Sequence, residues 1–171
     1  MGTKFSTRIW VSVVGIASIF FGSKGYADTV ISVADFGLKP DTRENAVAYV
    51  QKAIEACRGK EPVTLVFPEG RYDFWPQYAH EKNYYETNTY DVFPKRLAML
   101  FEGLHNITVD GNGSQFVMHD RIQPITVENC DGVTLKNFSI DWDIPLTAQA
   151  RVTKVGSDFF EIEINVLESP Y

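Results

Sequence analysis

Two aspartates flank a tryptophan at Asp141-Trp142-Asp143, and their spacing suits chemistry on a sugar. Side chains at positions i and i+2 of a strand lie on one face, about 6.6 Å apart along the chain. This separation is compatible with the roughly 6.5–9.5 Å between the carboxyl groups of inverting glycosidases, where one acid protonates the leaving oxygen and the other activates water. The pair can also hold sugar hydroxyl groups, or be two solvated acids on an exposed strand. Asp141 and Asp143 are therefore candidates for substrate binding and for catalysis.

The segment 72–93 is a second candidate surface, because it carries eight aromatic residues among 22. Aromatic rings can stack on the faces of sugars, while Asn, Asp and Glu side chains bind the hydroxyl groups. The four residues that we expect to contact a ligand here are Trp75, Tyr84, Tyr85 and Tyr90. The alternative is a long loop that folds onto the core and buries its own rings.

His119-Asp120-Arg121 is a third polar group, placed at the corner after a predicted strand. A histidine beside an aspartate can support general-base chemistry, but a hydrogen-bonded corner has the same composition. The three histidines of the chain lack the spacing of metal ligands, and the sequence contains no GxGxxG, Walker or GxSxG motif. We expect neither a metal nor a cofactor.

An internal repeat of 26 residues indicates how these groups are positioned. Segment 98–113 aligns with segment 124–139 at this offset, so that Ile107 matches Val133 and Met99 matches Ile125. Short apolar strands recur every eight or nine residues, separated by turn residues. Three short strands per repeat fit one turn of a right-handed parallel β-helix, in which equivalent strands pair. A β-sandwich with coincidental spacing is the alternative.

The same offset predicts which side chains share a face of the solenoid, because side chains alternate along a strand. We expect Asp141 and Asp143 to point outward. The residues expected to point inward are Phe116, Met118, Ile140, Trp142 and Ile144. Cys130 stacks over Leu104 in the interior.

A helix over 42–58 is expected to cover the open end of the solenoid, with Asp41 and Glu44 as a capping box. Its apolar face consists of Val47, Val50, Ile54 and Cys57, at steps of three and four residues. Cys57 and Cys130 are expected to remain two free, buried thiols. A disulfide would require their Cα atoms to lie within about 7 Å.

The pattern changes after Pro145, where residues 150–166 alternate apolar and charged side chains around a turn at 156–158. This alternation predicts an antiparallel hairpin, which we interpret as the start of a second, barrel-like β domain. The domains expected are therefore coils with a cap helix over 28–147 and a truncated β domain over 148–171. A solenoid of about three coils without a C-terminal cap indicates part of a larger protein.

Residues 1–27 have the composition of a Sec-type signal peptide. Lys4 and Arg8 precede an apolar run of 14 residues, which is shorter than the roughly 20 needed to span a bilayer, and a cleavage site follows at Ala27. Cleavage leaves 13 basic against 22 acidic residues, a net charge of −9. We expect a secreted or periplasmic protein without nucleic-acid binding or stable membrane insertion. An uncleaved signal anchor is the alternative.

The residues also resemble known families. The stretch VADFGLKPDTRENAVAYVQKAIEAC followed by VTLVFPEGRYDF resembles the opening module of pectin-lyase-like β-helix proteins. The run GLHNITVDGNGSQFVMHDRIQPITVENCDGVTLKNFSIDWDIPLTAQ is similar to glycoside hydrolase family 110, the secreted bacterial exo-α-1,3-galactosidases. This resemblance covers nearly all of residues 30–171, and IDWDIPLTAQ is its most specific part.

The resemblance implies a β-helix interrupted by β-barrel domains and an inverting hydrolase that releases terminal α-1,3-linked galactose from oligosaccharides or glycoconjugates. It places the paired catalytic aspartates of the family in a later coil, beyond Tyr171. We therefore expect little or no turnover by this chain alone. Two other functions remain open: a polysaccharide lyase, which would release an unsaturated product, and a glycan-binding protein without catalysis.

Overall fold

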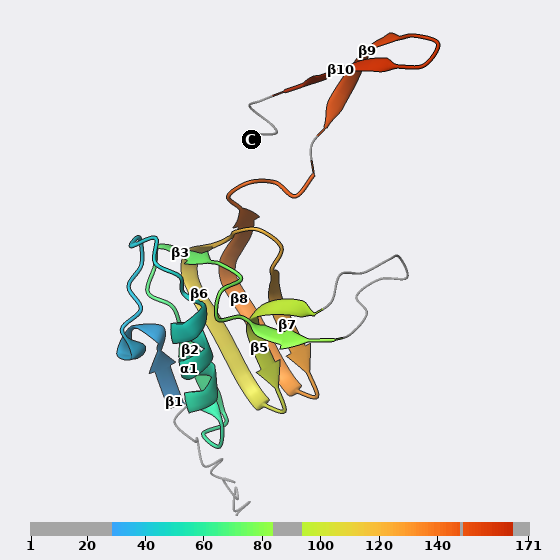
Figure 1. Cartoon of the computed structure of the whole chain (residues 1–171). Coiled ribbons are helices and arrows are strands. Elements are labelled where there is room, and N and C mark those ends of the chain that lie inside the picture. The colour runs from blue at the N-terminus through green and yellow to red at the C-terminus, as the bar shows by residue number, and fades with distance from the viewer. Residues whose placement is uncertain (1–28, 84–93, 148, 166–171) are drawn as a thin grey trace, which may run out of the picture.

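The computed structural model describes residues 29–83, 94–147 and 149–165. The expected signal peptide and three of the expected ligand-contacting residues, Tyr84, Tyr85 and Tyr90, lie outside these ranges. The described residues form ten strands, one α-helix and one short 3-10 helix. The strands belong to a five-stranded sheet, a three-stranded sheet and a two-stranded hairpin (Figure 1).

The largest sheet is parallel and is built around the long strand β6. The first half of β6 pairs with β2 and its second half pairs with β3, while β8 runs along both halves on the other side. β1 pairs with the outer side of β2. The strands are β1 (Thr29–Ser32), β2 (Val63–Val66), β3 (Arg71–Phe74), β6 (His105–Met118) and β8 (Asp131–Trp142).

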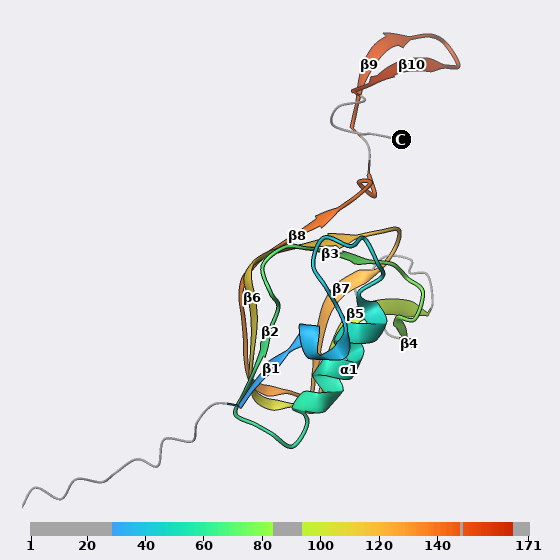
Figure 2. The same ribbon diagram turned by 90° about the vertical axis from the view of Figure 1, so that its left-hand side faces the viewer.

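A three-stranded sheet lies opposite the parallel sheet (Figure 2). β5 (Lys95–Glu102) pairs in parallel with β7 (Gln123–Glu128) and antiparallel with the short β4 (His80–Lys82). Lys82 joins all three strands, because its Nζ lies 2.8 Å from Glu102 Oε1 and 2.7 Å from Glu128 Oε2.

Helix α1 (Val47–Cys57) packs against β1, β2, β5 and the 3-10 helix η1 (Val33–Phe36). Its buried residues include the predicted face and Ala53. The predicted start and cap were wrong. The helix begins five residues later than expected, and its N-cap residue Ala46 makes no side-chain cap bond. Asp41 Oδ1 instead accepts a hydrogen bond from the backbone N–H of Arg71, so this side chain joins the preceding loop to β3.

The core lies between the two sheets and under α1. Phe67, Tyr72, Phe74 and Phe116 pack ring against ring, with centroids 4.8–6.2 Å apart. The inward orientation predicted for Phe116 and Met118 is confirmed, since both are fully buried, and Trp142 packs against the core. Ile140 and Ile144 are 38% and 52% exposed, contrary to prediction. Among the described strands, none pairs with the outer side of β8, so these two side chains have no neighbouring strand to cover them there.

The hairpin is formed by β9 (Ala150–Val155) and β10 (Phe160–Ile164), which pair antiparallel as predicted. It lies away from the sheets in both views, and every residue of its strands is exposed (Figures 1 and 2). Whether it begins a barrel-like domain stays a prediction.

Cys57 and Cys130 are free, with Cys57 buried and Cys130 partly buried. No helix within the described ranges is both long and apolar enough to cross a bilayer.

The predicted right-handed parallel β-helix is wrong as a description of this fold. The strands form separate small sheets, and β4 runs antiparallel to β5. The predicted pattern of three short strands per repeat is also absent, because the residues expected to turn at 110–113 lie inside the 14-residue strand β6. Asn112 and Gly113 have φ values of 49° and 84°, so they bend this strand and shift its register without ending it.

Candidate functional site

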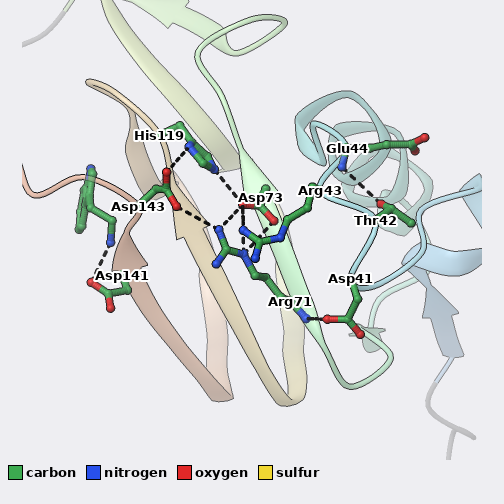
Figure 3. Close-up of polar contacts among 10 residues, drawn as sticks. Asp41, Thr42, Arg43, Glu44, Arg71, Asp73, His119, Asp141 and Asp143 are labelled. Atoms are coloured by element: carbon green, nitrogen blue, oxygen red, sulfur yellow. Dashed lines mark hydrogen bonds and ion pairs between the residues drawn. The ribbon is translucent and has the colours of Figure 1, made fainter. Parts of the chain in front are cut away.

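A cluster of polar side chains lies where β3, β6 and β8 end side by side (Figure 3). We call the group Arg71, Asp73, His119 and Asp143 the strand-end cluster. Phe74, Met118 and Trp142 are paired neighbours in the three strands, so the next residue of β6 and of β8 continues this row. Two backbone bonds hold the row together: His119 N donates to Phe74 O at 2.9 Å, and Asp143 N donates to Met118 O at 3.0 Å.

Asp73 is the centre of the cluster, and its side chain has no exposed surface. Its carboxylate accepts hydrogen bonds from Arg71 Nε at 3.0 Å and Nη2 at 2.6 Å. The exposed Arg43 adds a guanidinium nitrogen 3.8 Å away. Burial acts to raise the pKa of the Asp73 carboxyl, but the hydrogen bonds from Arg71 and His119 outweigh burial and lower that pKa below its usual value. The carboxylate is therefore a buried anion at neutral pH.

His119 lies between a buried carboxylate and an exposed one. Its Nε2 is 2.8 Å from Asp73 Oδ1, and its Nδ1 is 3.6 Å from Asp143 Oδ2. The ring stacks on Trp75, with centroids 3.9 Å apart and planes inclined by 6°. Asp73, Asp143 and Trp75 therefore border the ring on three sides, and only 14% of the His119 side chain is exposed.

Asp143 is the acid of the cluster that reaches solvent, with 44% of its side chain exposed. Arg71 Nη2 lies 3.3 Å from its Oδ1. The guanidinium thus connects both carboxylates, and its pKa is raised chiefly by the hydrogen bond to Asp73. Asp141 is exposed as predicted, but its Oδ1 accepts from the N–H of Trp142 at 2.8 Å and it takes no part in the cluster (Figure 3).

Trp75 is brought to the cluster by Asn45, which precedes α1. Asn45 Oδ1 accepts hydrogen bonds from the N–H groups of Val47 and Trp75, and its Nδ2 donates to the carbonyls of Trp75 and Gln77. Trp75 is partly buried and contacts His119, so in this structure it supports the cluster.

Of the residues that the sequence singled out, the structure brings Asp143, Trp75 and His119 together, and it adds Arg71 and Asp73, which the sequence analysis did not single out. A signal was present: residues two apart on a strand share a face, and an Arg-x-Asp pair on one face can form a salt bridge. The prediction of a hydrogen-bonded corner at His119-Asp120-Arg121 is right for His119. Its partners, however, are Asp73 and Asp143, and Asp120 is exposed.

The arrangement can bind a hydroxylated ligand. One carboxylate, that of Asp143, faces solvent, and the Arg71 guanidinium contacts one of its oxygens at 3.3 Å. Within the described ranges, no three His, Cys, Asp or Glu side chains are arranged to hold a metal ion.

Known proteins match most of the chain. It is 61% identical over 145 residues to a protein of Bacteroides thetaiotaomicron named alpha-1,3-galactosidase B, a match that covers 85% of this chain and 24% of the relative. It is 37% identical over 136 residues to alpha-1,3-galactosidase A of Shewanella woodyi, and 35% identical over 159 residues to an alpha-1,3-galactosidase B of Phocaeicola vulgatus. No family model matches the chain.

These matches confirm the resemblance to α-1,3-galactosidases that the sequence indicated. The matched part of the chain is homologous to a segment of these glycosidases. The chain spans about a quarter of the length of the relatives.

Proposed function

We propose that this chain is part of a glycoside hydrolase that releases terminal α-1,3-linked galactose from a glycan. The observation that carries the proposal is the 61% identity over 145 residues to an alpha-1,3-galactosidase B. Because the match covers a quarter of that relative, the proposal assigns the activity to the longer protein and a contributing role to this segment. An inverting mechanism belongs to the same proposal, as does export of the protein by the signal peptide at 1–27.

Within this segment, the strand-end cluster is proposed to bind a sugar hydroxyl through Asp143. The Arg71 guanidinium holds one oxygen of the Asp143 carboxylate, which leaves its exposed oxygen surface available for a hydroxyl donor. A hydrogen bond to a charged acceptor contributes about 1.5–3 kcal/mol. Asp141 and Trp75 remain proposed ligand contacts. Asp141 lies outside the cluster, and Trp75 stacks on the His119 ring.

Galactose release by a chimera tests the activity. The matched residues of this chain replace their counterparts in the Bacteroides thetaiotaomicron relative, and release of free galactose from α-1,3-galactobiose is measured beside the unaltered relative. We expect the chimera to release galactose, and the 171-residue chain alone to release little or none. A folded chimera without activity would contradict the proposal, as would an unsaturated, ultraviolet-absorbing product.

Asp143→Asn and Asp141→Asn in the same chimera form a matched pair that tests the binding role. We expect Asp143→Asn to raise KM by about tenfold, because it replaces a charge-assisted hydrogen bond with a neutral one. Asp141→Asn should have a smaller effect. Equal effects of the two substitutions would contradict the role given to the cluster.

A further inference from the structure

A cavity of about 400 Å³ lies beside helix α1, outside the strand-end cluster. Two tyrosines, Tyr49 and Tyr78, border it together with Glu44, Lys52 and the edge formed by Asn45 and Ala48. The combination of aromatic rings with one acid and one base is suited to a ligand that has both apolar C–H surfaces and hydroxyl groups.

Tyr78 is the least expected of these residues, because this large residue is 75% exposed. It occupies the third position of a turn that Ala79 N closes on Pro76 O at 3.2 Å, and its φ is 67°. Glycine or asparagine is preferred at a turn position with positive φ. A bulky side chain in this conformation that contributes little to the core leaves its ring available for contact with a ligand.

The loop that carries Tyr78 is fixed against the helix. Gln51 Nε2 donates to the carbonyl of Tyr78 at 2.9 Å, and Asn45 Nδ2 donates to the carbonyl of Gln77 at 2.9 Å. Gln51 belongs to α1, which also carries Tyr49 and Lys52, and Asn45 precedes this helix by two residues. The border of the cavity is therefore preorganised, which lowers the entropic cost of binding.

The charges of the cavity select against a strongly ionic ligand. Glu44 and Lys52 are both exposed and cancel in net charge, and neither side chain has an ion-pair partner within the described part of the chain. We propose that this cavity binds a neutral carbohydrate, with the tyrosine rings against the sugar faces and with Glu44 and Lys52 on its hydroxyl groups. This site is separate from the strand-end cluster and does not depend on the hydrolytic activity.

Binding is tested on the full 171-residue chain with methyl α-D-galactopyranoside and α-1,3-galactobiose as probes, followed by ¹H–¹⁵N NMR. We expect saturable shifts of the amide signals of Ala48, Lys52 and Tyr78. Tyr78→Ala should weaken binding at least about fivefold, whereas Phe160→Ala, which removes a similarly exposed ring from the hairpin, should not change it. Absence of saturable shifts, or binding unchanged by Tyr78→Ala, would overturn the proposal.

Tyr78→Gly separates a ligand contact from a structural role. Glycine relieves the positive φ, so the melting temperature should stay equal or rise while binding is lost. If Tyr78→Gly lowers the melting temperature and retains binding, the tyrosine is structural and the proposal is wrong. Tighter binding of galacturonate than of the neutral glycoside would also contradict it. A chimera that fails to release galactose leaves these results unaffected, so the two proposals can fail independently.

Discussion

His119 Nε2 lies 2.8 Å from Asp73 Oδ1, and the Asp73 side chain has no exposed surface. Because an ionised carboxylate only accepts hydrogen bonds, Nε2 carries the proton, and Nδ1 is the ring atom that faces Asp143. Asp73 thereby fixes the orientation of the His119 ring, and the Arg71 guanidinium is the group that connects Asp73 to Asp143. The pair links the interior of the parallel sheet to the solvent-facing end of the cluster.

Removal of the Asp73 charge should destabilise the fold more than removal of the Asp143 charge. Asp73→Asn leaves the Arg71 guanidinium without its buried partner, and breaking such a pair costs about 3–5 kcal/mol. Asp143 is 44% exposed, so Asp143→Asn should cost less than about 1 kcal/mol. Urea denaturation of both variants measures the difference. Equal losses of unfolding free energy in the two variants would contradict this prediction. They would show that the buried Arg71–Asp73 pair stabilises the fold no more than the exposed Arg71–Asp143 pair.

Acid should weaken the fold through the same carboxylate. In the folded state the pKa of the Asp73 carboxyl lies below its ordinary value of 3.8. The folded chain therefore binds fewer protons at this group than the unfolded chain does. The stabilisation that the ionised Asp73 gives to the fold is present above pH 3.8, and it is lost as the pH falls through the lower folded-state pKa. The unfolding free energy should therefore decline below about pH 4. In Asp73→Asn the decline should be shallower, and an unchanged slope would contradict the assignment.

The 26-residue repeat predicted part of the sheet pairing correctly. Ile107 pairs with Val133 and Met99 with Ile125, at the offset that the sequence indicated. Apolar positions repeat because equivalent strands stack on a common core, and this relation is visible in one sequence. The hairpin was predictable for a similar reason, since alternation and a turn are local properties.

The buried half of the candidate site was not predictable in this way. Arg71 pairs with Gln115, 44 positions later, and that offset differs from the repeat. The segment containing β4 and β5 intervenes between the two strands, so sequence periodicity could not align β3 with β6. The expected β-helix failed at another local point, because Asn112 and Gly113 bend β6 without ending it.

Cys130 should react with thiol reagents faster than Cys57. Cys57 is fully buried, and burial raises the pKa of its thiol to about 11, so it is almost entirely protonated at pH 8. Cys130 is partly exposed. Timed alkylation followed by peptide mass spectrometry measures the two rates, with the urea-unfolded chain as the control in which they should converge. Faster labelling of Cys57 in the folded chain would contradict its burial.

Gly111→Ala should disrupt the contact between β6 and β8. A Cβ at this position would lie 2.5 Å from Phe138 Cβ and 2.7 Å from the carbonyl oxygen of Asn137, so the strands would have to move apart. Overpacking of this kind costs about 1–3 kcal/mol. Gly59→Ala is a useful comparison, because nothing lies within 4 Å and only its φ of 73° opposes the substitution. Thermal melting should show the larger loss for Gly111→Ala.

Asn45→Ala should release Trp75 and the turn at 76–79 together, because one side chain bonds to Trp75 and Gln77 as well as to the start of α1. Each lost hydrogen bond costs about 0.5–1.5 kcal/mol, so the unfolding free energy should fall by about 2 kcal/mol or more. Gln51→Ala removes one bond, to the Tyr78 carbonyl, and should leave the Trp75–His119 stack intact. The indole N–H resonance of Trp75 reports this stack, and it should shift in Asn45→Ala but not in Gln51→Ala. A shift of the same size in both variants would mean that the loop moves as a whole and that Asn45 does not position Trp75 separately.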